Sequence, residues 1–166
     1  MIYTTTYQSP IGELTLASNG PSLVGLWFEN QQQSCNNLSY EHNEHKLPIF
    51  AETKRWLDLY FNGKQPNFFP KIEFLGTDFQ KLVWSELCNI EYGTTTTYKA
   101  IGQKVAKQMN RQTISAQAIG GAVGKNPIGI IVPCHRVIGT NGSLTGYAGG
   151  INRKIYLMKI ERIIGL

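Results

Sequence analysis

The first 28 residues alternate between apolar and polar positions in short runs, which is typical of the strands of a half-buried sheet. Three such runs cover residues 2–7, 14–17 and 23–28. Two turn sequences separate them, Ser9-Pro10-Ile11-Gly12 and Asn19-Gly20-Pro21, and both place Pro and Gly where the chain must reverse direction. We therefore expect a small antiparallel sheet at the N-terminus.

The spacing of apolar residues becomes helical at Pro48. Apolar side chains recur at helical intervals as far as Phe61, and Asn62-Gly63 ends the pattern. Residues 29–46, which precede this helix, are rich in Gln, Asn, Ser and His and are expected to form a surface loop.

A change of pattern after this helix suggests two domains. Residues 65–74 contain two prolines and should form an extended connector. We place the boundary there, between an N-terminal α/β subdomain over residues 1–75 and a C-terminal domain over residues 76–166.

The second half of the chain is mostly helical in pattern. Asp78, Thr97 and Ser115 can each cap the start of a helix. The four expected helices cover residues 78–91, 98–107, 115–123 and 151–164. A short apolar run, residues 128–132, is expected to be a buried strand that ends at Pro133-Cys134. The predicted fold class is therefore α+β, with a helix-turn-helix and a short strand in the C-terminal part.

Charge and composition narrow the classes of function. The chain has 166 residues, 42% of them hydrophobic, a net charge of +5 and a pI near 9.1, so binding to a polyanion is permitted but not established. No apolar run approaches the about 18 residues of a membrane span, and the N-terminal residues do not resemble a signal peptide. We expect a cytoplasmic protein with no membrane association.

The sequence offers no recognisable seat for a cofactor. It lacks a phosphate-binding glycine motif and the Cys and His spacings of a zinc site, so no cofactor and no metal are expected. His42 and His45 lie in a polar stretch and are interpreted as loop residues. The three cysteines, Cys35, Cys88 and Cys134, are too few and too far apart for a disulfide framework.

Two short helices joined by a polar link, over residues 98–107 and 115–123, could form a helix-turn-helix. The second helix consists largely of Ala and Gly. Glycine costs helix stability, and both residue types leave the helix surface nearly bare. Either another helix or a DNA groove could approach it closely. Nearby positive charge for phosphates comes from Lys99, Arg111 and Lys125.

The segment from Asn126 to Ile138 holds the strongest candidate chemistry. Its thiol, Cys134, is followed directly by His135 and Arg136, and a neighbouring cation or base favours the nucleophilic thiolate. A buried structural cysteine is an equally good interpretation from spacing alone. Because neighbouring side chains of a strand point to opposite faces, His135 can serve the sulfur only if the chain turns there or a water bridges them.

The run Pro133-Cys134-His135-Arg136-Val137 resembles the active-site signature of the methylated-DNA–protein-cysteine methyltransferases, also called O6-alkylguanine-DNA alkyltransferases. The resemblance extends over residues 79–161 and includes residues 7–12. It implies a ribonuclease H-like N-terminal subdomain. It also implies DNA repair by a single transfer of an alkyl group from O6-alkylguanine, and from O4-alkylthymine, to Cys134. The implied partner is double-stranded DNA, bound through its minor groove by a monomer.

The same resemblance assigns roles around the thiol. His135 would take the thiol proton through a water, Glu161 would orient and charge that histidine, and Asn126 would hold the turn before the cysteine. This relay follows the logic of nucleophile, base and orienting group. Without the resemblance, Glu161 would be interpreted as an ordinary surface residue.

Further positions are implied to meet DNA. Tyr98 would press on the backbone and donate a hydrogen bond to the leaving base of a flipped nucleotide. The other DNA-binding positions are Lys99, Arg111, Gln117, Lys125 and Thr140. The pocket for the base would be lined by Val132, Val137, Tyr147 and Ala148. Gln117 stands where the family usually has an arginine that fills the hole left by the flipped base, and glutamine brings no charge.

Three other functions remain to be weighed. Alkyltransferase-like proteins sense lesions without transfer but lack the cysteine, which is present here as Cys134. Cysteine hydrolases usually hold base and nucleophile far apart in sequence. A helix-turn-helix regulator would need side chains that read base edges, whereas residues 115–123 are mostly Ala and Gly.

Overall fold

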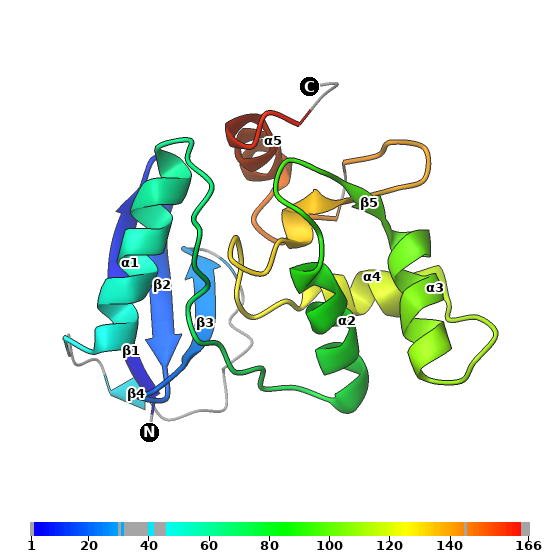
Figure 1. Ribbon diagram of the computed structural model, residues 1–166, viewed down its shortest axis with the longest axis horizontal. Coiled ribbons are helices and arrows are strands. Elements are labelled where there is room, and N and C mark those ends of the chain that lie inside the picture. The colour runs from blue at the N-terminus through cyan, green and yellow to red at the C-terminus, as the bar shows by residue number, and fades with distance from the viewer. Residues whose placement is uncertain (1, 30, 32–39, 42–45, 145, 164–166) are drawn as a thin grey trace. The chain divides into compact units, whose positions relative to one another are not determined.

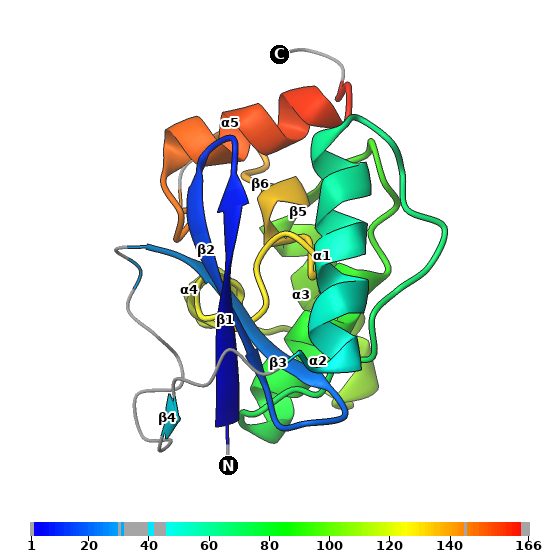
Figure 2. The same ribbon diagram turned by 90° about the vertical axis from the view of Figure 1, so that its left-hand side faces the viewer.

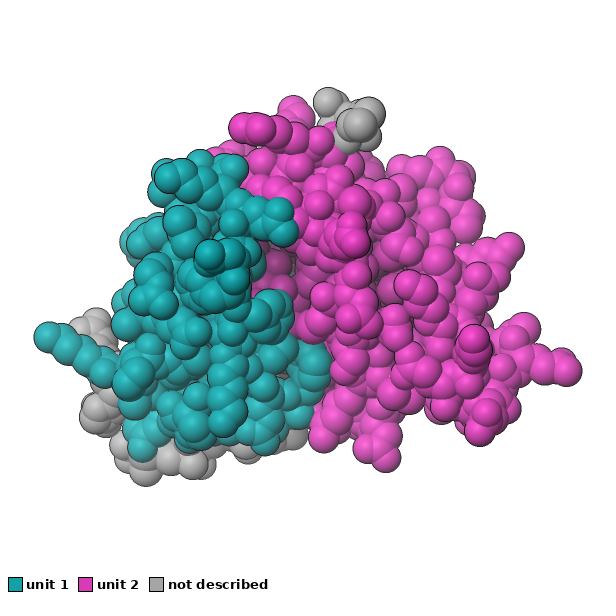
Figure 3. All heavy atoms as spheres, in the orientation of Figure 1, with its two compact units in different colours: residues 1–75, 127–129 teal, residues 76–126, 130–166 magenta. Residues whose placement is uncertain are grey.

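The computed structural model describes residues 2–29, 31, 40–41, 46–144 and 146–163. The chain divides into two compact units (Figure 3): residues 1–75 with 127–129, and residues 76–126 with 130–166. No helix within the described ranges combines the length and the apolar character that crossing a bilayer requires.

The first unit contains the antiparallel sheet that the alternating pattern predicts. Its strands lie in the order β3-β2-β1-β4, and Figure 2 shows β1 and β2 joined by a tight turn. The three main strands are β1 (Ile2–Ser9), β2 (Gly12–Ser18) and β3 (Leu23–Phe28). Both predicted turns are confirmed, since Ser9 pairs with Gly12 in the first and Ser18 with Leu23 across the second.

The expected loop over residues 29–46 is only partly described. The short strand β4 (Tyr40–Glu41) pairs in parallel with Ile2 and Tyr3 of β1, so a continuous loop was the wrong prediction at this point. Residues 30, 32–39 and 42–45, which include Cys35, His42 and His45, lie outside the described part of the chain.

Helix α1 (Pro48–Phe61) has the bounds that the sequence predicts and packs against the sheet (Figure 1). Its apolar face buries Trp56, Leu57 and Tyr60, which are at most 6% exposed. Proline is well suited to the first helical position because its missing N–H would have no partner there. The helix thus packs against a sheet whose strand β3 is buried along its whole length.

Strand β3 also forms backbone hydrogen bonds with two segments that are distant in sequence. The N–H of Leu23 donates to Lys71 O at 2.8 Å. Lys71 lies in the extended connector over residues 65–74 that the prolines predict. Leu26 donates to Pro127 O and accepts from the N–H of Gly129, both at 2.9 Å. Residues 127–129 therefore belong to the first unit although their neighbours on both sides belong to the second.

The second unit is mostly helical, as predicted, and the α+β fold class is confirmed. Its helices are α2 (Asp78–Cys88), α3 (Tyr98–Gln108), α4 (Ala116–Gly124), α5 (Ile151–Ile160) and the 3-10 turn η1 (Cys134–Arg136). Two short strands, β5 (Thr96–Thr97) and β6 (Val137–Ile138), pair in parallel.

The helix starts follow their predicted caps with one exception. Thr97 and Ser115 accept hydrogen bonds from the first turns of α3 and α4. Helix α2 is capped by Thr77 and not by Asp78, because Thr77 and Gln80 form a reciprocal capping box. Helices α2 and α5 end earlier than the periodicity predicts, at Cys88 and Ile160.

The apolar run 128–132 is buried but is not the expected strand. Ile130 has a φ of 67°, and a single bridge, from Ile128 to Leu26, pairs this run with a neighbouring strand in the described part of the chain. Proline at each end removes a backbone donor. The side chain of Asn126 donates to Val132 O at 2.8 Å and closes the segment into a compact loop.

Helix α4 is fixed against α2 by an indole. Trp84 is 2% exposed, and its Nε1–H donates to Ala122 O at 2.8 Å. A Cβ at Gly76 would lie 2.6 Å from the Trp84 ring, so the chain before α2 can approach the ring this closely only as glycine. This single side chain therefore sets the distance between the two helices.

We expect Trp84→Phe to lower the free energy of unfolding by about 2 kcal/mol, because Ala122 O keeps only the N–H of Lys125 as a donor and part of the ring volume is left empty. Urea unfolding measures this as a lower midpoint with an unchanged slope. Phe69→Leu, at a position 49% exposed, is the control and should change stability by less than about 0.5 kcal/mol. Equal midpoints for Trp84→Phe and the parent would contradict this account of the helix contact.

Candidate active site

Cys134 is the first residue of a tight turn. The turn η1 follows Pro133, and the N–H of Cys134 donates to Val132 O at 2.8 Å. The side chain of Cys134 is largely buried, with 7% of the residue exposed. The chain turns here, so Cys134 and His135 are not held on opposite faces of a strand, which is the condition for His135 to serve the sulfur.

The surroundings of Cys134 keep it a thiol at rest. Burial raises the pKa of Cys134, while a hydrogen bond from Asn126 and the positive charge of Lys154 lower it by less. Asn126 thus serves both the thiol and the loop carbonyl of Val132. The predicted role of Asn126 at this turn fits its position.

His135 and Glu161 form a fully buried pair. His135 Nε2 lies 2.5 Å from Glu161 Oε2, and neither side chain is exposed to solvent. Glu161 is the residue directly after α5 and not a member of the helix. The pair joins the residue after Cys134 to the residue after α5, and this is the contact that the resemblance implies.

Two further groups bind the second oxygen of Glu161. Arg136 Nε donates to Oε1 at 2.7 Å, and the N–H of Gly93 donates to the same oxygen at 3.0 Å. Burial opposes ionisation, but the hydrogen bonds and charges of His135 and Arg136 lower the pKa of Glu161 to about 2. Glu161 is therefore a carboxylate at every pH near neutrality.

Sequence reasoning missed one buried cation, Lys154. Its residue exposure is 0%, and its Nζ donates to Val137 O at 2.6 Å. Burial lowers the pKa of Lys154, and the negative charge that Cys134 carries when it ionises raises it. Lys154, Leu157, Met158 and Glu161 recur at helical spacing on one buried face. A lysine on the apolar face of a helix was the signal that could have revealed it.

Two tyrosines lie within electrostatic reach of Cys134 when its thiol ionises. After burial, the negative charge of Cys134 is the next cause that raises the pKa of both Tyr98 and Tyr147. Tyr98 Oη is 3.2 Å from the position of a Cβ on Gly146, so the glycine loop passes against this hydroxyl. The structure thus brings Tyr98, Tyr147 and Lys154 together around Cys134.

The other predicted pocket residues differ in exposure. Val132 and Val137 are fully buried beside the cysteine turn. Tyr147 is half-buried and Ala148 is exposed, both on the loop between β6 and α5. A flat group entering from solvent could meet these two before it reaches the sulfur.

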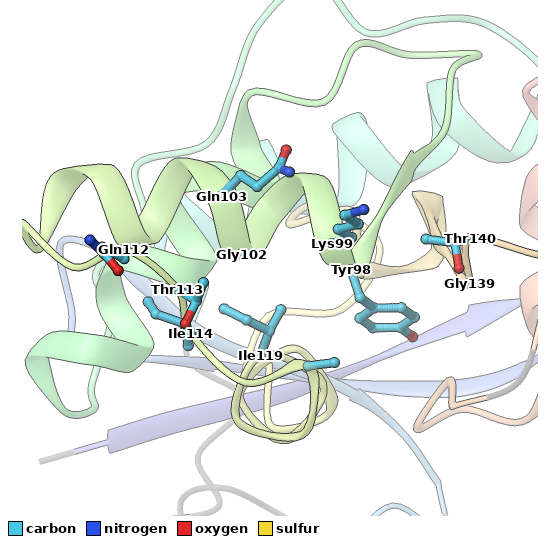
Figure 4. Close-up of a pocket in the computed structure, with 11 residues that line it drawn as sticks. Tyr98, Lys99, Gly102, Gln103, Gln112, Thr113, Ile114, Ile119, Gly139 and Thr140 are labelled. Carbon is cyan, nitrogen blue, oxygen red and sulfur yellow. The ribbon is translucent and has the colours of Figure 1, made fainter.

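A cavity of about 560 Å³ lies between α3, the start of α4 and the loop after β6 (Figure 4). Three of the predicted DNA-binding residues line it: Tyr98, Lys99 and Thr140. Arg111, Gln117 and Lys125 are exposed in the same unit but do not line the cavity. The structure therefore separates the predicted DNA contacts into a cavity group and a surface group.

The described residues hold no cluster of three or more His, Cys, Asp or Glu side chains that could bind a metal ion. Cys88 is half-buried, and burial raises its pKa to about 11. It is thus a poor nucleophile near neutral pH.

Comparison with known proteins identifies the family to which this site belongs. Two family models match the chain: the ribonuclease-like domain of 6-O-methylguanine DNA methyltransferase over residues 2–74, and its DNA binding domain over residues 78–163. The methylated-DNA–protein-cysteine methyltransferase of Methanosarcina barkeri is 42% identical over 160 residues, which is 96% of this chain and 97% of that protein. The protein of that name from Mycobacterium tuberculosis is 42% identical over 166 residues, covering 98% and 93% of the two chains.

A solved structure agrees at the level of the fold. The crystal structure of Mycobacterium tuberculosis OGT in complex with DNA has a TM-score of 0.81 and 41% sequence identity, and covers 96% of this chain and 92% of that one. The expected ribonuclease-like N-terminal part is supported by the family match over residues 2–74. By sequence and by fold, the chain belongs to the 6-O-methylguanine DNA methyltransferase family.

Proposed function

We propose that this protein is a methylated-DNA–[protein]-cysteine S-methyltransferase that repairs DNA in a single turnover. It moves a methyl or other alkyl group from O6-alkylguanine, and from O4-alkylthymine, to its own Cys134. One observation supports this above all: the cysteine turn lies beside a buried His135–Glu161 pair at 2.5 Å. The names of the relatives agree with it.

The reaction is a displacement at carbon. Cys134 Sγ attacks the alkyl carbon in line, the new S–C bond forms, and the C–O bond breaks with its electron pair on the guanine oxygen. The thiol proton passes to His135 through a water, and Glu161 stabilises the imidazolium. The product is a thioether that no neighbouring group reverses, so each protein molecule acts once.

His135 is suited to take this proton through its second ring nitrogen. Glu161 holds Nε2, so Nδ1 is the atom available to the thiol side. Lys154 and Asn126 lower the pKa of Cys134 against the effect of burial, and both therefore stabilise the thiolate as it forms. The charge of the nucleophile develops only inside a site that already holds its partners.

The alkylated base must leave the duplex to reach the sulfur. Base flipping costs a few kcal/mol, and less at a damaged pair. Tyr98 presses on the backbone beside the flipped nucleotide and donates a hydrogen bond to the leaving base. Val132, Val137, Tyr147 and Ala148 line the base pocket.

The DNA contacts lie on the second unit. Its exposed helix α4 presents a surface of small residues that fits the minor groove. Phosphates meet Lys99, Arg111, Lys125 and Thr140, and Gln117 occupies the place of the flipped base. We assign residues 76–166 to DNA binding and alkyl transfer and residues 1–75 to an N-terminal subdomain, in a monomer that works in the cytoplasm without a cofactor. Lesion sensing without transfer is not favoured, because Cys134 is present.

The proposal predicts one added methyl group per protein molecule after incubation with duplex DNA that contains O6-methylguanine. Intact mass spectrometry counts the methyl groups, and peptide mapping should place the single group on Cys134. Cys134→Ser should gain none, while Cys88 and Cys35 remain unmodified. An unmodified parent protein, or a methyl group on Cys88, would refute the assignment.

Glu161→Gln should slow methyl transfer by about a hundredfold or more, because a neutral amide cannot stabilise the imidazolium that forms on His135. Single-turnover quenched-flow assays measure the rate, and circular dichroism checks that the variant folds. Glu91→Gln removes an exposed carboxylate of the same unit and should keep the parent rate. Equal rates for Glu161→Gln and the parent would exclude Glu161 from the relay.

Gln117→Arg should tighten duplex binding and make it more sensitive to salt. An arginine in the place of the flipped base also brings a positive charge among the phosphates of the duplex, so the plot of log affinity against log salt concentration should steepen by up to about one. Gln65→Arg adds the same charge to an exposed site of the first unit and should leave the slope near that of the parent. Unaltered binding, or slower repair, in Gln117→Arg would show that the glutamine is not the weak point of DNA binding.

A further inference from the structure

The third residue of the cysteine turn is a buried cation that the transfer steps above do not use. Arg136 is 7% exposed. Its Nε donates to Glu161 Oε1 and its Nη1 donates to Ile90 O, both at 2.7 Å, and its guanidinium lies 5.6 Å from the centre of the Tyr92 ring. An arginine held from three sides in the interior is poorly placed to move out and meet a phosphate.

The position of Arg136 matters because of what a carboxylate does to a histidine. An unscreened carboxylate 2.5 Å from an imidazole stabilises the protonated ring. A histidine that already carries its second proton cannot accept one from a thiol. The relay therefore needs Glu161 to orient His135 without protonating it in advance.

Charges from two elements decide the balance at His135. The helix α5 and its end supply Lys154 and Glu161, and the turn η1 supplies Cys134 and Arg136. Burial lowers the pKa of His135, Glu161 raises it, and Arg136 and Lys154 lower it, with a net decrease. Tyr92 and Arg162 are the other titratable groups near Glu161.

We propose that Arg136 is a positioning residue that fixes and neutralises the second oxygen of Glu161, so that His135 stays an unprotonated base until Cys134 gives up its proton. This inference rests on the proposed transfer to Cys134. It explains why the carboxylate binds a permanent cation and a backbone N–H, from Gly93, on the oxygen that does not face the histidine. The resting site then holds a neutral thiol and a neutral imidazole.

Two substitutions distinguish the effect of the Arg136 charge from the effect of its hydrogen-bond geometry. Arg136→Gln keeps one amide donor but removes the charge, and Arg136→Lys keeps the charge but loses the planar fork. Two readouts are taken for each: the titration of the His135 ring by NMR in the absence of DNA, and the single-turnover rate on an O6-methylguanine duplex as a function of pH. His135→Gln identifies the resonance of interest among the three histidines.

For Arg136→Gln we expect the His135 midpoint to rise by about one pH unit or more. The acid limb of the rate profile should move with it, giving about a tenfold loss of rate at pH values below both midpoints and recovery at higher pH. Arg136→Lys should titrate with the parent. Arg162→Gln, which removes an exposed arginine of the same region, should leave both readouts unchanged.

A His135 titration in Arg136→Gln equal to that of the parent, with a rate that falls equally at every pH, would make Arg136 purely structural and overturn the inference. If Arg136→Gln does not fold, Arg136→Lys decides, since a raised His135 midpoint there contradicts a role carried by charge. If even the parent transfers no methyl group, the proposed function fails, while the His135 titration still decides the role of Arg136.

Discussion

The candidate site depends on a carboxylate that has been taken out of water and given three hydrogen-bond donors in return. An isolated buried carboxylate would be costly, and Glu161 escapes this cost only because His135, Arg136 and Gly93 all donate to it. These donors come from η1 and from the turn before β5, whereas Glu161 ends α5. The parallel pairing of β5 with β6 joins the same regions through the backbone. The polar cluster thus determines how three separate stretches of the second unit meet.

Local chemistry made most of the fold predictable. Strand alternation, turn residues and helix caps are short-range signals, and β1 to β3, α1, α3 and α4 follow them closely. The failures came where tertiary contacts override local preference. Residues 128–132 are apolar enough for a strand, yet Asn126 and two prolines hold them in a loop. Strand β4 pairs with β1 over two residues, a contact that no periodicity could reveal.

The sequence predicted those site residues that are adjacent along the chain. The family resemblance added residues that are distant along the chain. Cys134 and His135 are adjacent in sequence, so the motif shows them directly. Glu161 carries no local signal of its own, and only the resemblance connected it to His135. Lys154 and the N–H of Gly93 were missed because their importance comes from burial and from contacts across the fold. Lys154 was visible in the sequence as a charge on the apolar face of α5, but its hydrogen-bond partner, Val137 O, was not.

The segment Pro127–Gly129, which belongs to the first unit although it lies between stretches of the second, limits how the two halves of the chain can evolve. These residues hydrogen-bond with Leu26 of β3 and lie only a short way before the reactive thiol. The ribonuclease-like half is thus not a removable appendage. Any truncation or domain exchange that discards its sheet also strips the backbone partners from the stretch leading to Cys134, so the two halves are constrained to be inherited together.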